Sequence, residues 1–337
     1  MNLEQRIAAF IKLGLSIGDL GEEELGKLTK QVENNNNWFT PAQTIFALKE
    51  ISGLLEEAKL REWLRNYHIS HEIPAKGIGI LMAGNIPAVG FHDFLCVLIS
   101  GHDVHAKLSS SDKILIPWMA GKLVSFEPLF SSKIFFEDML KGKDAYIATG
   151  SDNSSRYFNY YFGKFPHIIR KNRTSLAVLD GLENGEDYKA LAFDIFQYFG
   201  LGCRNVSKLY IKNEEHLQDF LNEIEGFQET LSHHKYLNNY DYNKAIYLVN
   251  GEAHLDNGFL LLKESKELVS PISVLYYEIY QNTEMLTQKI QTDSAKIQCI
   301  VSKNGWYPDS VPFGKSQQPN LEEYADKVDT LNFLINL

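Results

Sequence analysis

The chain contains little cysteine, and its three cysteines lie far apart. Cys96, Cys203 and Cys299 are an odd number at wide spacing, which argues against a disulfide framework and favours a reducing compartment where a free thiol persists. The first 20 residues carry acidic side chains early and no uninterrupted apolar run, so they do not resemble a secretory signal. No stretch approaches the roughly 20 apolar residues that cross a bilayer. We therefore expect a cytoplasmic protein.

The usual signatures of nucleotide and metal sites are also missing. Neither Gly-x-Gly-x-x-Gly nor Gly-x-x-x-x-Gly-Lys-Ser/Thr occurs, so a dinucleotide, if one binds, binds in another mode. Several histidines are loosely spaced, and no cysteine or carboxylate completes a zinc set with them: His68, His71, His92, His102 and His105. We expect no metal. The net charge of −10 gives no electrostatic reason to bind nucleic acid or anionic lipid.

The composition is that of a folded globular protein, with 44% hydrophobic and 23% charged residues. A length of 337 residues predicts about two lobes. Roughly the first 70 residues have helical periodicity, and Thr40 before Pro41 is a typical helix start. From Gly77 onward, short β-rich runs alternate with helical stretches, which indicates an α/β fold with doubly wound parallel sheets. We expect two α/β lobes that meet near residue 175, with a ligand cleft between them.

The segment GNIPAVG, residues 84–90, follows a predicted buried strand and leads into a predicted helix. Ligands bind at the carboxyl ends of strands in such sheets, and the side-chain amide of Asn85 could donate to an oxyanion there. The alternative is that Asn85 only caps the helix, with Pro87 at its first turn.

Cys203 lies in a glycine-rich turn, YFGLGCRNVS, after a predicted helix and before a predicted strand. Gly200 and Gly202 allow the close backbone approach that an exposed nucleophile and its oxyanion donors need. The neighbouring Arg204 favours a thiolate. A lone cysteine is more often a small buried hydrophobe, and the other two cysteines lie in apolar runs that fit this reading. Cys203 does not.

Read together, these segments resemble the aldehyde dehydrogenase superfamily, and more closely its LuxC-like fatty acyl-CoA reductase branch, over roughly residues 77–334. Asn85-Ile86-Pro87 matches an Asn-x-Pro motif, which implies that Asn85 supplies an oxyanion amide. GLGCRNVS is similar to the sequence around the family's nucleophile, which implies catalysis by Cys203. VPFGKSQQP, residues 311–319, resembles the family's Pro-Phe-Gly segment.

The same resemblance implies the residues that bind a nicotinamide cofactor, NADPH or NADH. Lys107 in HAKLSS stands where the family has a lysine for the adenosine ribose. ATGS resembles a Thr-Gly-Ser turn beside the cofactor, which implies contacts by Gly150 and Ser151. Glu267-Leu268-Val269-Ser270-Pro271 is similar to Glu-x-Phe-Gly-Pro, whose glutamate holds the nicotinamide ribose, although Ser270 replaces the glycine.

The implied fold is α/β and aldehyde-dehydrogenase-like, with two doubly wound lobes and a helical N-terminal region. We expect a helical region over 1–75 packed on a cofactor-binding lobe over 76–174, a catalytic lobe over 175–312, and a C-terminal segment over 313–337.

The implied activity is reduction of a long-chain fatty acyl-CoA or acyl-carrier thioester to the aldehyde through an S-acyl cysteine. We find no counterpart of the general-base glutamate that hydrolytic aldehyde dehydrogenases use, and its loss favours reduction, because the acyl-cysteine must be kept from water. Two alternatives remain: a non-acylating aldehyde dehydrogenase or semialdehyde reductase, and a non-catalytic vestigial subunit. The resemblance also implies homo-oligomers and an acyl-transferring partner protein.

Overall fold

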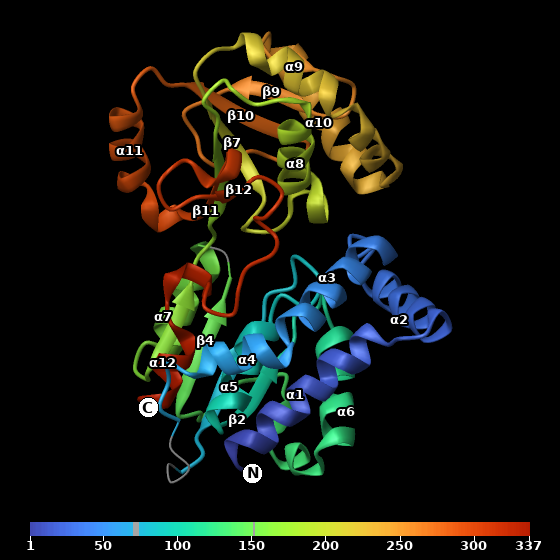
Figure 1. Cartoon of the computed structure of the whole chain (residues 1–337), viewed down its shortest axis with the longest axis vertical. Coiled ribbons are helices and arrows are strands. Elements are labelled where there is room, and N and C mark those ends of the chain that lie inside the picture. Colours follow the sequence, from blue (N-terminus) through green and yellow to red (C-terminus); the bar gives the residue numbers. More distant parts are fainter. Residues whose placement is uncertain (70–73, 151) are drawn as a thin grey trace. The chain divides into compact units, whose positions relative to one another are not determined.

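The computed structural model describes residues 1–69, 74–150 and 152–337, which form two compact units. The first unit comprises Met1–Asn172 together with Asn320–Leu337, and the second comprises Arg173–Pro319 (Figure 1). The chain therefore leaves the first unit once and returns to it for its last segment.

The first unit begins with helices, as the periodicity predicts. They are α1 (Leu3–Gly18), α2 (Glu22–Asn35), α3 (Pro41–Leu54) and α4 (Glu57–Leu64). The predicted start of α3 is confirmed, because the Thr40 side chain accepts a hydrogen bond from Gln43 N and Pro41 occupies the first turn. Helix α1 packs against α3, α5 and α6, so the helical region joins the rest of the unit through α5, which lies on β1 and β2, and through α6.

A five-stranded sheet follows, with the order β3-β2-β1-β4-β5 and all pairs parallel. Its strands are β1 (Gly77–Leu81), β2 (Asp103–Lys107), β3 (Ile134–Phe136), β4 (Ala145–Thr149) and β5 (His167–Arg170). The connecting helices are α5 (Phe91–Ser100), α6 (Leu115–Phe126), a short 3₁₀ helix (Pro128–Ser132) and α7 (Asp152–Phe162). Parallel strands joined by crossovers place all their carboxyl ends at one edge.

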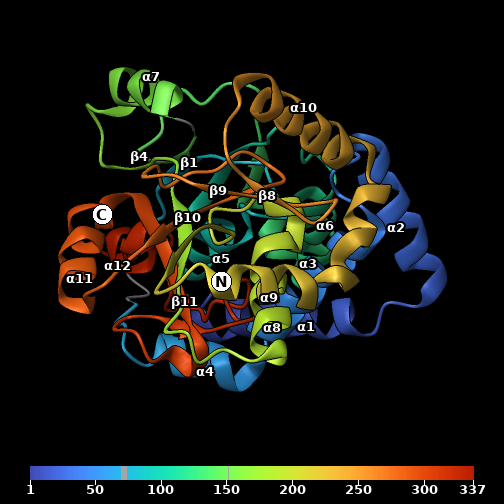
Figure 2. The ribbon, with the colours of Figure 1, turned by 90° about the horizontal axis from the view of Figure 1, so that it is seen from above.

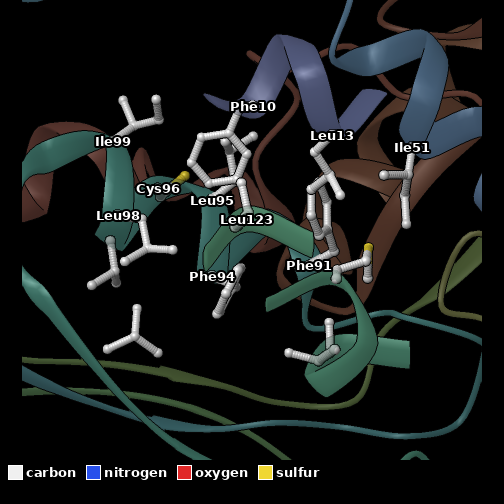
Figure 3. Close-up of a cluster of buried hydrophobic side chains, with 14 of the residues drawn as sticks. Phe10, Leu13, Ile51, Phe91, Phe94, Leu95, Cys96, Leu98, Ile99 and Leu123 are labelled. Atoms are coloured by element: carbon white, nitrogen blue, oxygen red, sulfur yellow. The ribbon is translucent and has the colours of Figure 1, made fainter. Parts of the chain in front are cut away.

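The core of this unit lies between the sheet and the N-terminal helices, where the apolar faces of α1 and α5 pack against each other (Figure 3). Phe10 of α1 meets Phe91 of α5 edge to face, with ring centroids 6.5 Å apart. Cys96 lies in the same cluster and is fully buried, so the prediction that it acts as a small hydrophobe is confirmed.

The last segment of the chain completes this core. Helix α12 (Thr330–Ile335) packs on α5 and follows a 3₁₀ turn (Ala325–Lys327). The guanidinium of Arg170 donates to both carboxylate oxygens of Asp93 on α5 and, at 2.8 Å, to Thr330 Oγ1. This buried ion pair ties β5, α5 and α12 together.

The second unit is built on a seven-stranded sheet with the order β12-β11-β6-β7-β10-β9-β8, parallel except for the pair β8 and β9. Its strands are β6 (Thr174–Val178), β7 (Val206–Ile211), β8 (Leu255–Asp256), β9 (Leu261–Glu264), β10 (Val274–Ile279), β11 (Ile297–Ser302) and β12 (Val311–Pro312).

Helices cover this second sheet on both sides, as doubly wound folds require. They are α8 (Gly185–Phe196), α9 (Glu215–Glu223), α10 (His234–Asn250) and α11 (Thr283–Thr292), with 3₁₀ helices η2 (Gln197–Gly200), η3 (Glu225–Ser232), Ser294–Lys296 and Lys303–Gly305. Figure 2 shows α8 and α9 on one side of β9 and β10, and α10 on the other. Among the described residues, no helix is both long and apolar enough to span a bilayer.

Candidate active site

Three of the predicted site residues follow neighbouring strands of the first sheet. Leu81, the last residue of β1, pairs with Lys107 at the end of β2 and with Ala148 near the end of β4. The segment with Asn85 continues from β1, and Gly150 follows β4 directly. The structure therefore brings Asn85, Lys107 and Gly150 to the same carboxyl edge, where ligands of such sheets bind.

A buried carboxylate fixes the backbone of the loop that carries Asn85. Asp112 Oδ2 accepts a hydrogen bond from Ala88 N at 2.7 Å, and Ala88 adopts a left-handed conformation with φ of 55°. Burial raises the pKa of Asp112 above its ordinary value, while the backbone donors oppose that rise. Helix α5 starts at Phe91 with Gly90 as its N-cap, so the alternative that Asn85 caps this helix is wrong. The Asn85 side chain is exposed.

Lys107 and Gly150 differ in what surrounds them. The Lys107 side chain is exposed at the end of β2. Gly150 is enclosed, because a Cβ there would lie 2.7 Å from the Phe158 ring on α7. Ser151, predicted beside the cofactor, and His71 lie outside the described residues. Among the residues that are described, no group of three potential metal ligands occurs.

Cys203 lies in the second unit, in a turn between η2 and β7, as predicted. It is half-exposed, whereas Cys96 and Cys299 are buried. Burial raises the pKa of the Cys96 thiol well above its ordinary value, which makes that thiol unreactive. Of the three cysteines, Cys203 is thus the one with access to a reagent or substrate.

The side chain of Asn205, two residues after the cysteine, organises the turn. Its Oδ1 accepts from Gly202 N at 2.7 Å, while its Nδ2 donates to the carbonyls of Asp194 at 3.0 Å and Gln197 at 2.7 Å. The carbonyl of Cys203 itself accepts from Ser175 Oγ on β6 at 3.0 Å. Asn205 is 2% exposed, so these bonds are shielded from water and hold the backbone on both sides of the cysteine.

The turn also stores backbone strain. Tyr198, Phe199 and Gly200 are three consecutive left-handed residues, with φ of 54°, 56° and 76°. Each such non-glycine residue costs about 1–3 kcal/mol and persists only where the surroundings impose it. Here the Phe199 ring packs on His233, 4.4 Å between ring centroids, and on Tyr236 of α10. Strain of this kind is common beside catalytic residues.

Glu267 lies in the loop between β9 and β10, and β7 holds that loop. Lys208 is fully buried, and its ammonium donates to the carbonyl of Glu267 at 3.2 Å and to Glu278 Oε2 at 2.9 Å. Ser207 Oγ donates to the carbonyl of Leu268 at 2.7 Å. The Glu267 carboxylate remains exposed. The strand that begins after the Cys203 turn therefore also fixes the backbone of Glu267.

Sequence reasoning missed Asp194, Asn205 and Lys208. Asp194 is the only charged residue between Lys189 and Arg204, and this isolation in the apolar second half of α8 was the signal that could have found it. Lys208 is a similar case, as a lysine inside an apolar strand. Asn205 carries no such signal, because asparagine is ordinary in a turn.

Comparison with known proteins gives similarity in structure only. No protein-family model matches the sequence, and no curated protein matches it. Aldehyde dehydrogenase 21 from Physcomitrella patens, in complex with its reaction product succinate, matches with a TM-score of 0.70 and 11% identity, over 100% of this chain and 84% of that one. A variant of aldehyde dehydrogenase C from Pseudomonas syringae, in complex with NAD⁺ and octanal, matches with a TM-score of 0.63 and 9% identity, over 89% and 72%.

The delta-pyrroline-5-carboxylate dehydrogenase from Mycobacterium tuberculosis matches with a TM-score of 0.59 and 14% identity, over 90% of this chain and 67% of that one. Identities this low establish the fold and nothing finer. The predicted fold class is confirmed: this chain has the α/β fold of the aldehyde dehydrogenases, with two mostly parallel sheets and helices at its N-terminus.

Proposed function

We propose that this protein is an NAD(P)H-dependent reductase that converts a long-chain fatty acyl thioester, carried on CoA or on another thiol, into the aldehyde. The observation that carries the proposal is the placement of Cys203, the one cysteine of the three that is half-exposed, in a turn fixed on both sides by buried hydrogen bonds. A nucleophile must be both accessible and held in one direction. The shared fold is compatible with a nicotinamide cofactor, since solved structures with this fold include proteins bound to NAD⁺.

In the first step, the thiolate of Cys203 attacks the acyl carbon of the thioester. A carbon–sulfur bond to Cys203 forms, the bond to the carrier sulfur breaks, and the carrier leaves as a thiolate that takes up a proton. The backbone N–H of Cys203 donates to the oxygen that becomes negative, which contributes about 3 kcal/mol, and the Asn-x-Pro motif assigns the side-chain amide of Asn85 to oxyanion binding as well.

Reduction then releases the product. A reduced nicotinamide, when bound, would supply the hydride for the acyl carbon, and Cys203 would hold the reduced acyl group as a thiohemiacetal. The carbon–sulfur bond breaks, the aldehyde leaves and the thiolate is restored. One thioester, one reduced cofactor and one proton thus give one aldehyde, one thiol and one oxidised cofactor. The lack of a recognisable general-base glutamate in the sequence agrees with this direction, since water must not reach the acyl group.

The exposed side chains fit the polar groups of a dinucleotide. Within the described part of the chain, the Lys107 ammonium has no hydrogen-bond partner, so it is available to donate to a ribose hydroxyl at the carboxyl edge of the first sheet. The exposed carboxylate of Glu267 can accept from a ribose hydroxyl. Gly150 would let backbone approach the cofactor closely.

The decisive experiment uses a radiolabelled long-chain acyl-CoA without cofactor, followed by a search for a hydroxylamine-sensitive adduct. Wild type and Cys299→Ala should both become labelled, and Cys203→Ala should not, because only Cys203 is accessible among the cysteines. Addition of NADPH or NADH should then discharge the label as aldehyde.

Each other outcome has a distinct meaning. No label on wild type across several chain lengths and carrier thiols rejects the reductase. Oxidation of aldehydes with NAD⁺ in the absence of any thioester turnover would instead indicate a non-acylating aldehyde dehydrogenase. Label that persists in Cys203→Ala rejects Cys203 as the nucleophile.

A further inference from the structure

Asp194 on α8 presents a fully buried carboxylate next to the turn of Cys203. Its two oxygens accept from two backbone donors of the segment after β12, from Gly314 N at 2.7 Å and from Ser316 N at 3.0 Å. Within the described residues it forms no ion pair. Burial of a carboxylate without a counter-ion lowers the stability of the folded state. The feature of Asp194 that the structure uses is its pair of acceptor oxygens.

Hydrogen bonds connect Asp194 to the cysteine turn by two routes, one through its carboxylate and one through its backbone carbonyl. Ser316, whose N–H Asp194 holds, accepts at its carbonyl from Arg204 Nη1 at 3.2 Å. The backbone carbonyl of Asp194 accepts from Asn205 Nδ2 at 3.0 Å. Both residues that follow Cys203 are therefore bonded to Asp194 or to the segment it holds.

We propose that Asp194 is a positioning residue that sets the direction of the Cys203 thiol, by fixing residues 313–316 and, through Ser316 and Arg204, the turn itself. It touches neither substrate nor cofactor. This inference rests on the proposed function only in that Cys203 is the nucleophile. A neutral asparagine could not replace the carboxylate, since it has a single acceptor oxygen for two donors.

The charge state of Asp194 gives the proposal a measurable signature. Burial raises the pKa of this carboxyl to about 6, while Lys315 and the donors of Gly314 and Ser316 oppose the rise. The segment after β12 faces it with Lys315, and Arg204 of the turn before β7 bonds to the same segment at the carbonyl of Ser316. Of the other elements packed on α8, α9 presents Glu223, which lies 3.9 Å from the ammonium of Lys189, while the rings of Phe220 on α9 and Phe227 on η3 pack on Tyr188 and Phe196. On protonation, one oxygen becomes a donor, and the two backbone N–H groups can no longer both be satisfied.

The test measures the rate of alkylation of Cys203 by iodoacetamide between pH 5 and 9, read by mass spectrometry of the peptide. This assay needs neither substrate nor cofactor. For a thiol that responds only to its own ionisation, the logarithm of the rate rises with pH with a slope of one until the thiol is ionised. In the wild type, the alkylation rate below about pH 6 should differ from this line by at least about threefold, because the turn shifts as Asp194 is protonated.

Two variants distinguish positioning from a general loss of structure. Asp194→Asn should follow the line with a slope of one throughout, and the exposed Asp219→Asn on α9 should behave as wild type. In Arg204→Met, Asp194 can still titrate, but the hydrogen bond from Arg204 to Ser316 is lost. The alkylation rate of this variant should therefore also follow the line with a slope of one below about pH 6. If Asp194→Asn fails to fold, Arg204→Met alone decides the question.

A profile that is the same in wild type, Asp194→Asn and Arg204→Met would overturn the proposal. A second outcome is that the wild type is not acylated, while its alkylation rate still departs from the line below pH 6 and the rates of both variants do not. This outcome would reject the reductase but retain the positioning role. The two failures are therefore separable.

Discussion

Asn205 donates a hydrogen bond from its side-chain amide to the carbonyl of Gln197 at 2.7 Å, and so closes the loop that carries Cys203. The loop between these two residues contains the left-handed run that starts at Tyr198. An amide can hold both sides of such a loop, because it donates and accepts at once. The backbone around Cys203 is therefore held by a side chain that is itself buried.

Replacement of Asn205 by alanine should destabilise the protein by about 3 kcal/mol, because Gly202 N and the carbonyls that Asn205 serves would lose their buried partner, at about 1–3 kcal/mol for each unsatisfied group. Urea unfolding checks this. Asn34→Ala, at an exposed position on α2, is the matched control and should change stability by less than about 0.5 kcal/mol. Equal effects in the two variants would show that the turn does not depend on Asn205.

The three thiols should react in two distinct classes. In the native protein, iodoacetamide should modify Cys203 at least about tenfold faster than Cys96 or Cys299, which are buried. In denaturant, all three should react at similar rates. Peptide mapping by mass spectrometry checks the order. Early modification of Cys96 would contradict the packing of α5 against α1.

The buried ion pair of the first unit should contribute far more to the free energy of unfolding than an exposed ion pair does. Asp93→Ala leaves Arg170, which is 3% exposed, without its carboxylate, at an expected cost of about 3–5 kcal/mol. Glu24→Ala removes an exposed pair with Lys122 at 2.9 Å and should cost less than about 1 kcal/mol. Thermal unfolding of both variants measures the difference. A small effect for Asp93→Ala would mean that the last segment is held by apolar packing alone.

Lys208→Met should weaken cofactor binding without slowing the attack by Cys203. The variant loses the ammonium that holds the carbonyls of Ser265 and Glu267, so the loop of Glu267 becomes free to move. On the proposed function, we expect the KM for NAD(P)H to rise about tenfold, the loss of about one charged hydrogen bond. Lys266→Met removes an exposed lysine of the same loop and serves as the control. A slower formation of the acyl-enzyme in Lys208→Met would place its role elsewhere.

As the pH rises from about 4 to about 6, the titration of Asp194 should lower the stability of the folded protein. Its pKa is raised by burial to about 6 in the folded protein, above the ordinary 3.8, so the folded state binds the proton more tightly than the unfolded state does in this range. Raising the pH therefore removes stability, on the order of 3 kcal/mol over the full shift. Asp194→Asn should lack this slope in unfolding experiments at several pH values. A slope that survives in the variant would assign the titration to another group.

The sequence was most informative where structure is local. Alternating runs predicted β1 and β2, and the Thr40-Pro41 pair predicted the start of α3. The inward face of α3 was less well predicted. The helical spacing of Ile45 and Leu48 puts both on one apolar face, yet Ile45 is 41% exposed while Thr44 is fully buried. Thr44 can be buried because its hydroxyl donates to the carbonyl of Phe39, a bond that hydrophobic periodicity does not contain.

The support of the candidate site could not be predicted for a different reason. Asp194 lies 120 and 122 residues from the two donors that it holds. A contact of this range follows from how strands β6, β7, β11 and β12 are ordered, and a single sequence does not show that order. Cys203 and Asn85 could be selected because their motifs are local, while the residues that fix their surroundings are distant in the chain.

The return of the last segment to the first unit has a consequence for synthesis. Leu331 and Leu334 of α12 are fully buried in the core that α1 and α5 begin, yet they are translated only after the whole second unit. A growing chain therefore carries an unfinished first core, with the surface of α5 uncovered, while the second unit already has all its strands. The first core can therefore be completed only after the second unit has been synthesised.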